Sequence, residues 1–328
     1  LYSVGLEGGE PLQLTEGQDW SCKGPKFSAD GDQIYCDYEP ENMQVYNLDG
    51  IGRFDWSKGR KLGKPQVITK GFDRSVSSFE ISDNGRTLFI TAADAGRTRI
   101  YKMPAKGGSV KALNPDSRGV YAGLQVAGKN MLAKWENSAN PAEIVRIDKN
   151  GRHKTLTGFN ADRLKGVDVQ PFKEFWFENS NGRQVHSWLA LPPNFDKNKK
   201  YPLVLQIHGG PFSSSMDAGH VRWSAALLAS PGYVVLMTDY TGSVGYGEQF
   251  SRDISGDPLK TPSMDVLEAA RVAIERYPFI DENRQAATGA SYGGHMVNWL
   301  QATTTHFKTL VGHAGPVSYT HLRAHETV

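Results

Sequence analysis

Hydrophobic and polar residues alternate along the first half of the chain in short runs that predict β-strands. Two of these runs follow the turn sequences SADG at residues 28–31 and SDNG at residues 82–85. Asp-Gly and Asn-Gly between alternating runs are the strongest short signals for a β-hairpin. A Leu or Ile followed by Thr or Asn then recurs at Leu14, Ile68, Leu113 and Leu156. Strands that repeat every 40–55 residues are typical of β-propeller blades, so we expect the chain to start inside one blade and then to complete three.

From about residue 170 the pattern changes to continuous apolar runs that alternate with helical segments. A hairpin over 174–178 and 184–191 is expected first, and the apolar runs then cover residues 201–207, 233–238, 285–289 and 309–312. The clearest helix is expected at 263–277, with Thr261 and Pro262 as its N-cap and first residue. All-apolar strands that alternate with helices predict a doubly wound, mostly parallel sheet that is covered on both faces. The second half is therefore expected to be α/β.

Composition and charge remove several classes of protein. The 328 residues are too many for one ordinary core, so two domains are expected. The 37 Lys and Arg residues against 35 Asp and Glu leave a net charge of +2 without a basic block, which argues against a nucleic-acid partner. The longest apolar stretch lies between Arg222 and Asp239, and Ser-Pro-Gly interrupts it at 230–232. It is too short and too interrupted to predict a membrane span.

The two cysteines, Cys22 and Cys36, flank a predicted turn almost symmetrically. They could form a cross-strand disulfide or remain two buried thiols, and buried thiols are the more ordinary outcome.

The sequence GASYGG at residues 289–294 fits the G-x-S-x-G pattern of a nucleophile elbow. A predicted strand leads into it and a helix-compatible stretch follows. In such a turn Gly289, Gly293 and Gly294 avoid clashes, and Ser291 projects above the sheet next to the first amides of the helix. The alternative is a glycine-rich packing turn, but the strand–turn–helix context favours Ser291 as a nucleophile.

Two further loops are expected at the same edge of the sheet. His-Gly-Gly-Pro at 208–211 ends the first long apolar strand, where Gly209 and Gly210 could direct backbone amides into an oxyanion hole or simply form a strand-end turn. His208 is expected to be structural rather than a base, because of its place beside this strand. Residues 239–247, which include Tyr246, are expected to form a rim loop; no helix is expected directly after them.

A serine hydrolase also needs a base and an acid, which follow the nucleophile in the order Asp or Glu, then His. Only 37 residues follow Ser291, and they contain no Asp and only Glu326. His295 is too close to Ser291 in sequence, and no suitable acid precedes His306, His313, His321 or His325. The triad is therefore expected to be incomplete here. No metal motif occurs, and we expect neither a metal nor a cofactor.

These motifs, together with the predicted blades, resemble the prolyl oligopeptidase family (S9) of serine peptidases, most nearly its acylaminoacyl-peptidase and dipeptidyl-peptidase 5 branch. The resemblance extends to about Val317. It implies that Ser291 is the nucleophile and that the amides of Tyr292 and Gly210 form the oxyanion hole. It also implies residues 1–165 as the C-terminal blades of a β-propeller and residues 166–317 as the N-terminal part of an α/β-hydrolase domain.

The triad Asp and His of this family would lie beyond the last residue. Residues 318–328 resemble a peptide translated from sequencing-adapter DNA, so we expect them to be foreign to this gene and His321 and His325 to have no function. The chain is thus expected to be an inactive fragment of a peptidase for short peptides. The branch favours a periplasmic or secreted protein; the oligomeric state is not predicted. A carboxylesterase and a catalytically inactive propeller binding module are the alternatives, the latter because the acid and base are missing.

Overall fold

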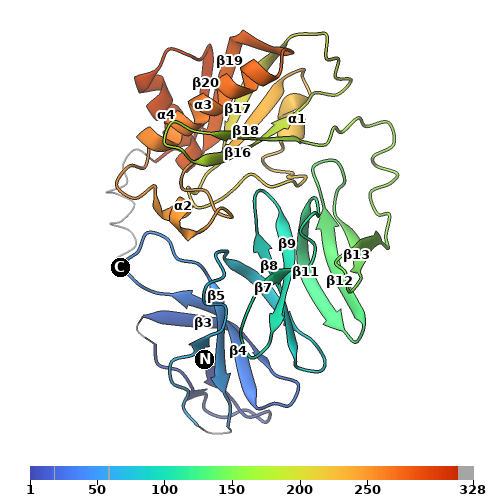
Figure 1. Ribbon diagram of the computed structural model, residues 1–328, viewed down its shortest axis with the longest axis vertical. Helices are drawn as coiled ribbons and strands as arrows, with labels where there is room; N and C mark the ends of the chain where they lie inside the picture. The colour runs from blue at the N-terminus through green and yellow to red at the C-terminus, as the bar shows by residue number, and fades with distance from the viewer. Residues whose placement is uncertain (18, 58–59, 317–328) are drawn as a thin grey trace. The chain divides into compact units, whose positions relative to one another are not determined.

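The computed structural model describes residues 1–17, 19–57 and 60–316 of the chain. The chain divides into two compact units, which are described separately (Figure 1). The first unit comprises Leu1–Trp135 and Glu143–Gly158, and the second comprises Glu136–Ala142 together with Phe159–Val328.

The first unit consists of β-strands. A two-stranded sheet holds β1 (Tyr2–Ser3) and β2 (Leu12–Gln13), and a four-stranded sheet holds β3 (Trp20–Phe27), β4 (Gln33–Pro40), β5 (Gly50–Asp55) and β6 (Gln66–Val67). The third sheet contains β7 (Val76–Ile81), β8 (Thr87–Ala93), β9 (Thr98–Pro104), β10 (Lys111–Ala112), β11 (Val120–Ala127), β12 (Asn130–Glu136), β13 (Glu143–Ile147) and β14 (His153–Thr155). A single parallel pair, Val120 with Thr98, joins β11 to β9, so this larger sheet consists of two sets of four consecutive strands.

The predicted hairpins of this unit are confirmed. β3 pairs antiparallel with β4 across the turn at 28–31, and β7 pairs antiparallel with β8 across the turn at 82–85. In each turn a serine closes the loop: the Ser28 Oγ accepts from the amide of Gln33 at 2.9 Å, and the Ser82 Oγ accepts from that of Thr87 at 3.0 Å. Cys22 on β3 and Cys36 on β4 form a disulfide, so the less ordinary of the two outcomes for the cysteines is the one found.

The second unit contains a six-stranded sheet in the order β15-β16-β18-β17-β19-β20. Its strands are β15 (Lys173–Glu178), β16 (Gln184–Ala190), β17 (Tyr201–Ile207), β18 (Val234–Asp239), β19 (Ile280–Ala290) and β20 (Thr309–His313). The first two strands form the predicted hairpin, and β16 is antiparallel to β18. The other neighbours are parallel, as the continuous apolar runs predicted.

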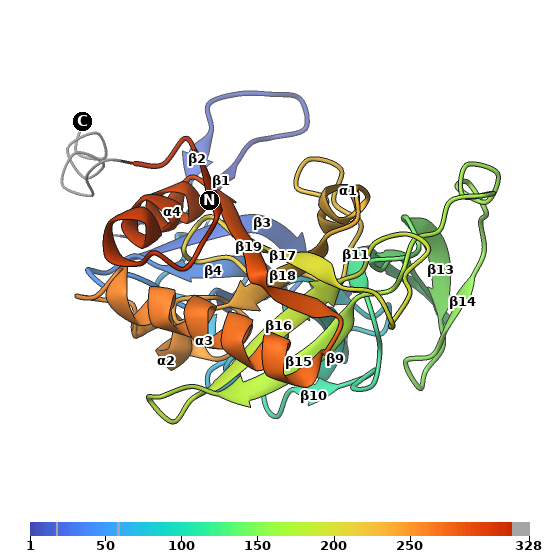
Figure 2. The ribbon, with the colours of Figure 1, turned by 90° about the horizontal axis from the view of Figure 1, so that it is seen from above.

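Helices cover both faces of this sheet. Alternate residues of β17 and β18 point to opposite sides: Leu203, Leu205 and Leu236 share a core with residues of α3 (Lys260–Arg276) and α4 (Tyr292–Thr303). Val204, Val235 and Met237 instead pack with α1 (Ala225–Ala229). Figure 2 shows α3 and α4 on one side of the strands and α1 on the other. The expected doubly covered α/β arrangement is therefore present.

The helix expected at 263–277 is present, but two predicted details about helices were wrong. The helix expected at 263–277 begins at Lys260, three residues earlier, because the Asp257 carboxylate rather than Thr261 accepts from the first amides. Partial burial alone would raise the pKa of Asp257, but the hydrogen bonds from the Thr261 hydroxyl and from these amides together hold it below its usual value. A short helix, α2 (Glu248–Arg252), does begin directly after the loop at 239–247.

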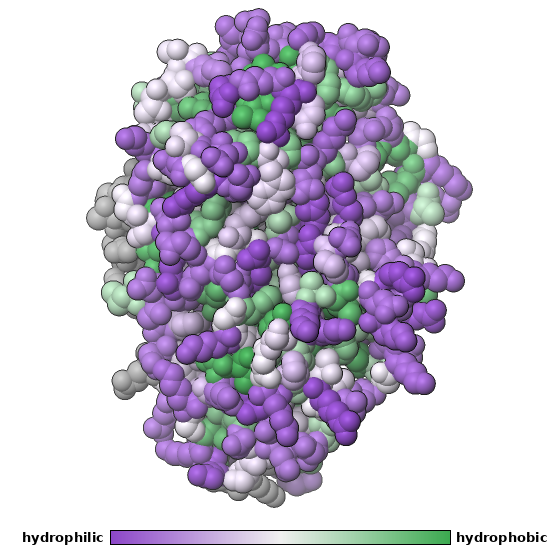
Figure 3. Space-filling view, in the orientation of Figure 1, coloured by the Kyte–Doolittle hydropathy of each residue, from purple (hydrophilic) through white to green (hydrophobic). Residues whose placement is uncertain are grey.

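Among the described residues, no helix is long and apolar enough to cross a membrane. The longest, α3, has 17 residues and carries lysine, glutamate and arginine side chains along it. The face of the molecule in Figure 3 is mainly hydrophilic, with apolar residues in small separate groups.

Candidate active site

Ser291 lies in a tight turn between β19 and α4, as the elbow pattern predicts. Its backbone has φ of 57° and ψ of −124°, a conformation that L-residues rarely adopt. Its amide donates to the carbonyl of His313 at 3.0 Å, and its carbonyl accepts from the amide of His295 at 3.0 Å. Both bonds hold the turn in place, and the Ser291 side chain is exposed.

The glycines around Ser291 are required by close backbone contacts. A Cβ atom on Gly289 would lie 2.5 Å from the carbonyl carbon of Gly293, and one on Gly293 would lie 2.3 Å from the carbonyl oxygen of Ile207. A Cβ on Gly294 would meet the carbonyl oxygen of His313 at 2.5 Å. Because backbone atoms cannot move aside as side chains can, the absent side chains let α4 start directly against β17 and β20.

The loop after β17 lies against the elbow. A Cβ placed on Gly209 would be 3.1 Å from the carbonyl oxygen of Ala290 and 3.4 Å from the Cβ of Ser291. Gly210 has φ of 123°, which only glycine adopts readily, and a cis peptide joins it to Pro211. The structure therefore brings Gly209 next to Ser291, and Gly210 lines the same pocket as Ser291.

His208 is fixed by hydrogen bonds at both ring nitrogens. Its Nδ1 lies 2.8 Å from the carbonyl oxygen of Gly209, an acceptor, so Nδ1 carries the proton and Nε2 accepts from the Ser243 hydroxyl at 3.0 Å. The ring stacks on Tyr240 at 4.3 Å between ring centroids, and the Tyr240 hydroxyl donates to the His208 carbonyl. Burial lowers the pKa of His208, which keeps the ring neutral. This arrangement agrees with a structural role.

Asp239, at the end of β18, joins the loops that surround the site. One carboxylate oxygen accepts from the amide of Ser215 at 2.6 Å, and the other accepts from the hydroxyl of Tyr246. Asp239 is completely buried. One carboxylate thus holds both the loop after β17 and the predicted rim loop.

His186 of β16 completes this buried cluster. Its Nδ1 lies 3.2 Å from Asp239, its Nε2 lies 3.2 Å from Glu174, and its ring lies between Trp176 and Trp188 at 4.8 and 4.7 Å. Burial disfavours the charged ring, but hydrogen bonding and attraction to the two carboxylates outweigh burial and raise the pKa of His186. The arrangement favours an imidazolium between two carboxylates.

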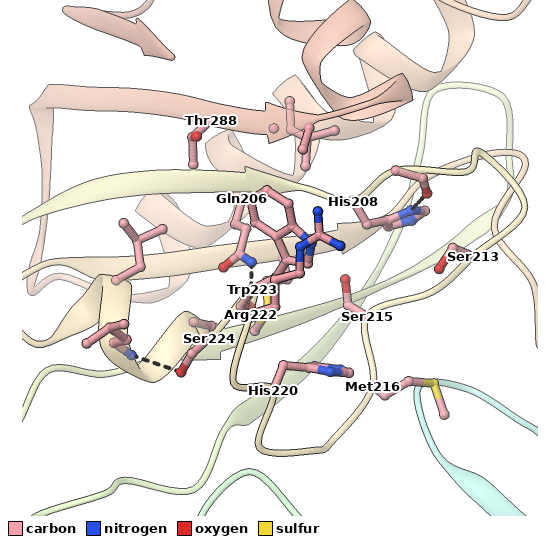
Figure 4. Close-up of a pocket in the computed structure, with 18 of the residues that line it drawn as sticks. Gln206, His208, Ser213, Ser215, Met216, His220, Arg222, Trp223, Ser224 and Thr288 are labelled. Carbon is pink, nitrogen blue, oxygen red and sulfur yellow. Dashed lines mark hydrogen bonds between the residues drawn. The ribbon is translucent and has the colours of Figure 1, made fainter. Parts of the chain in front are cut away.

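A pocket of about 820 Å³ opens beside the elbow, and both Ser291 and the Gly209–Gly210 pair line it. Figure 4 shows the loop that carries Ser213, Ser215 and Met216 on one side of this pocket and Thr288 of β19 on the other. Its remaining lining is mainly apolar and includes Phe172, Trp223, Leu228 and Met237.

The other residues predicted for the site differ in how their side chains are placed relative to Ser291. The Tyr292 side chain is buried and its hydroxyl donates to the carbonyl of Pro258 at 2.7 Å, so any part it plays in an oxyanion hole falls to its backbone amide. Tyr246 contributes to the Asp239 cluster from the rim loop. Within the described residues, no hydrogen bond to the Ser291 hydroxyl is found, and no group of His, Cys, Asp and Glu could hold a metal ion. His321, His325 and Glu326 lie outside the described residues.

The sequence analysis missed the Asp239–His186 cluster and the side chains that shape the pocket. Asp239 is 53 residues from His186, and the two meet only because β16 pairs with β18. The sequence did contain one signal, because Asp239 ends an apolar run. A carboxylate buried at such a position needs hydrogen-bond partners.

Comparison with known proteins shows which family the chain resembles. Residues 219–327 match the model described as the prolyl oligopeptidase family. Dipeptidyl-peptidase 5 of Aspergillus fumigatus is 33% identical over 308 residues, which cover 89% of this chain and 41% of the relative. Over these residues the chain is similar to members of the prolyl oligopeptidase family. Dipeptidyl-peptidase 5 of Porphyromonas gingivalis is 28% identical to this chain. The match covers 96% of this chain and 46% of that relative. The chain therefore spans less than half the length of these relatives.

Solved structures of other peptidases share the fold. An acylaminoacyl peptidase in complex with Z-Gly-Gly-Phe-chloromethyl ketone superposes with a TM-score of 0.80 at 24% identity, covering 96% of this chain and 48% of the other. The acylaminoacyl peptidase of Pyrococcus horikoshii gives a TM-score of 0.77, also at 24% identity, with coverages of 94% and 46%. At this identity the likeness shows the fold.

Proposed function

We propose that this chain carries the nucleophile and the oxyanion-binding amides of a serine peptidase that hydrolyses short peptides. The observation that carries the proposal is the conformation of Ser291: φ of 57° in a turn between a buried strand and a helix, beside a pocket of about 820 Å³. Such a strained turn persists only where the surrounding structure fixes it, and it presents the hydroxyl at the edge of the sheet. The match to the prolyl oligopeptidase family supports the same assignment.

In the proposed reaction the Ser291 oxygen attacks a peptide carbonyl and forms a tetrahedral intermediate. The amides of Tyr292, at the start of α4, and of Gly210, next to the elbow, stabilise the negative charge on the carbonyl oxygen. The amine leaves, and water then hydrolyses the acyl-enzyme. Gly289, Gly293 and Gly294 shape the turn, and Gly209 allows the Gly210 loop to approach it.

The proton of the Ser291 hydroxyl needs a base, and His208 does not suit this role. Both of its ring nitrogens already have partners, the Gly209 carbonyl and the Ser243 hydroxyl. We assign His208 to holding the oxyanion loop instead. The Tyr246 hydroxyl donates to Asp239, and this bond holds the rim loop. Tyr246 and Asp239 are therefore proposed to shape the site without taking part in the chemistry.

We also propose the finer division of the chain. The three sets of four strands, β3–β6, β7–β10 and β11–β14, support propeller blades within residues 1–165. The six-stranded sheet with helices on both faces supports part of an α/β-hydrolase domain within residues 166–317. The proposed foreign tail, 318–328, lies outside the described residues.

The test uses the protein made from the complete reading frame of this gene. A fluorophosphonate probe should label Ser291, with the Ser291→Ala variant as the unlabelled control, and the labelled protein should cleave dipeptidyl or acylaminoacyl substrates. Absence of labelling at Ser291 would contradict the assignment and favour a binding module. Labelling with turnover of simple esters but of no peptide would favour a carboxylesterase.

A further inference from the structure

The pocket beside Ser291 contains one fixed charge. Among the described residues that line it, Arg222 is the only lysine, arginine, aspartate or glutamate. The other polar groups of the lining are neutral hydroxyls, an amide and imidazoles. The only fixed charge in this lining is therefore a cation, with no carboxylate beside it in the lining.

No described residue forms an ion pair with Arg222. Within the part of the chain that the structure describes, its side chain makes no ion pair and no hydrogen bond. Its guanidinium lies 5.4 Å from the ring centroid of Trp223, and Figure 4 shows the two side chains together in the pocket. Stacking of this kind limits the conformations of the guanidinium and leaves its N–H edge available to a ligand.

The backbone that carries this pair is held on several sides. The Trp223 carbonyl accepts from the side-chain Nε2 of Gln206 at 2.9 Å, and the Ser224 hydroxyl accepts from the backbone amide of Leu227 at 3.1 Å. Further back in the same loop, the Asp239 carboxylate accepts from the Ser215 amide at 2.6 Å. The one acidic residue of this loop, Asp217, is turned away from the pocket lining and accepts from Ser138.

We propose that this pocket binds a carboxylate of the substrate through Arg222, so that the preferred substrates are peptides with a carboxylate near the scissile bond. The proposal rests on the proposed function, since it takes Ser291 as the nucleophile of the same site. A guanidinium binds a carboxylate through two parallel N–H···O bonds, and the apolar walls accommodate the rest of the side chain. A pocket without a carboxylate in its lining offers no counter-charge to a substrate ammonium group.

The carboxylate could be an acidic side chain or a free C-terminus, and binding measurements with three peptides separate these sources. The first peptide is acetylated at its N-terminus, amidated at its C-terminus and contains Asp. The second is identical except that Asn replaces Asp. The third contains Asn and has a free C-terminal carboxylate. Calorimetric titration of the 328-residue chain with Ser291→Ala measures binding without turnover. We expect the first or the third peptide to bind at least about fivefold more tightly than the second at low salt, with the advantage reduced at high salt.

Variants of arginine identify the residue responsible. Arg222→Gln should remove the roughly fivefold advantage of the carboxylate peptide and leave the neutral peptide within about twofold. Arg222→Lys should retain part of the advantage, because the charge remains while the paired N–H geometry is lost. The matched control is Arg163→Gln, which makes the same change of net charge at another exposed arginine of the second unit that does not line the pocket.

Equal binding of the three peptides, or an equal loss for Arg222→Gln and Arg163→Gln, would overturn the proposal. These results are independent of the proposed function, because binding is measured in the absence of the Ser291 hydroxyl. A failure of fluorophosphonate labelling with intact carboxylate binding would reject the nucleophile and keep the site. Normal labelling without carboxylate selectivity would reject only the role of Arg222.

Discussion

The strained backbone of Ser291 depends on neighbours that have no side chain. A methyl group on Gly293 would lie 2.3 Å from the Ile207 carbonyl oxygen and 2.9 Å from that of His208. We expect Gly293→Ala to lower the free energy of unfolding by about 2–3 kcal/mol, since α4 must move away from β17. Urea denaturation followed by tryptophan fluorescence measures this change. Gly63→Ala, where the new methyl group would meet nothing within 4 Å, is the matched control. Equal stability of the two variants would contradict the close contact.

His186 gives the second unit a pH-dependent stability. Burial disfavours its charge, but hydrogen bonds and attraction to Asp239 and Glu174 raise its pKa in the folded state. The folded protein therefore binds this proton more tightly than the unfolded chain does. Its contribution to stability is complete below the ordinary histidine pKa of about 6.5 and is lost as the pH rises through the raised value.

The prediction concerns the difference between two titrations. Thermal unfolding of the wild type from about pH 6 to about pH 9 should show a loss of stability that His186→Gln lacks. Tyr246 and His208 also face Asp239, so the comparison between variants isolates the contribution of His186. An exposed histidine of the pocket, His220, serves as the control in His220→Gln. Parallel curves for wild type and His186→Gln would refute a proton held between the two carboxylates.

At the residue scale the sequence predicts what depends on local spacing. Ser291 and its glycines are separated by one or two residues, so a short pattern contains the geometry of the turn. The Asp239–His186 pair and the Arg222–Trp223 stack are not contained in any such short pattern. The first depends on which strands pair, and the second on where the loop after β17 places two adjacent side chains. Neither the pairing of strands nor the path of a loop follows from local spacing.

At the scale of elements, burial decides how well the sequence predicts boundaries. The mainly apolar run at 201–207 coincides with β17, because Leu203–Leu205 and Ile207 are buried between two layers. β19 begins at Ile280, five residues before the predicted run, since its first part is polar and partly exposed. The start of α3 was mispredicted for a related reason: Asp257, three residues before Lys260, caps the helix, and the pattern favoured a nearer Thr-Pro pair.

The disulfide between β3 and β4 links two strands of the first unit. It closes a loop with a sequence separation of 14 residues, and such a cross-link lowers the conformational entropy of the unfolded chain. We expect Cys22→Ser/Cys36→Ser to lower the free energy of unfolding of this unit by about 3 kcal/mol. The measurement is denaturation with and without a reductant. The reductant should destabilise the wild type and leave the double variant unchanged; an equal response of both proteins would show that the disulfide contributes nothing.

At the scale of the whole molecule, the chain does not divide at one point. The sequence pattern changes at about residue 170, and the family resemblance implied a boundary at 165/166. The compact units instead divide at Gly158/Phe159, and the segment Glu136–Ala142 from within the first unit's range belongs to the second unit. That exchanged segment lies in the second unit through Ser138, whose amide and hydroxyl both donate to the buried Asp217, and whose hydroxyl accepts from the Phe172 amide. Ser138 is one polar residue between two strands, and nothing in the local sequence indicates that its segment packs with the second unit.

The last prediction concerns catalysis by the 328 residues alone. Within the described residues no hydrogen bond reaches the Ser291 hydroxyl, and His208 is already engaged at both nitrogens. A serine without a base and an acid keeps only the part of the rate enhancement that comes from the oxyanion hole and from binding. We therefore expect peptide turnover by this chain to be about 10³-fold or more below that of an activated serine peptidase. Hydrolysis of dipeptidyl and acylaminoacyl substrates, with Ser291→Ala as the blank, measures it.

Two variants distinguish the source of any activity that is found. His321→Ala and His325→Ala, at positions outside the described residues, should leave the rate unchanged, because we expect neither to act as the base. A rate that is high and falls with either substitution would place the base in that segment. A high rate that falls only with Ser291→Ala would instead show that a described residue moves to Ser291 when substrate binds, and His313 would then be the first to replace, since it lines the same pocket and its carbonyl already holds the Ser291 amide.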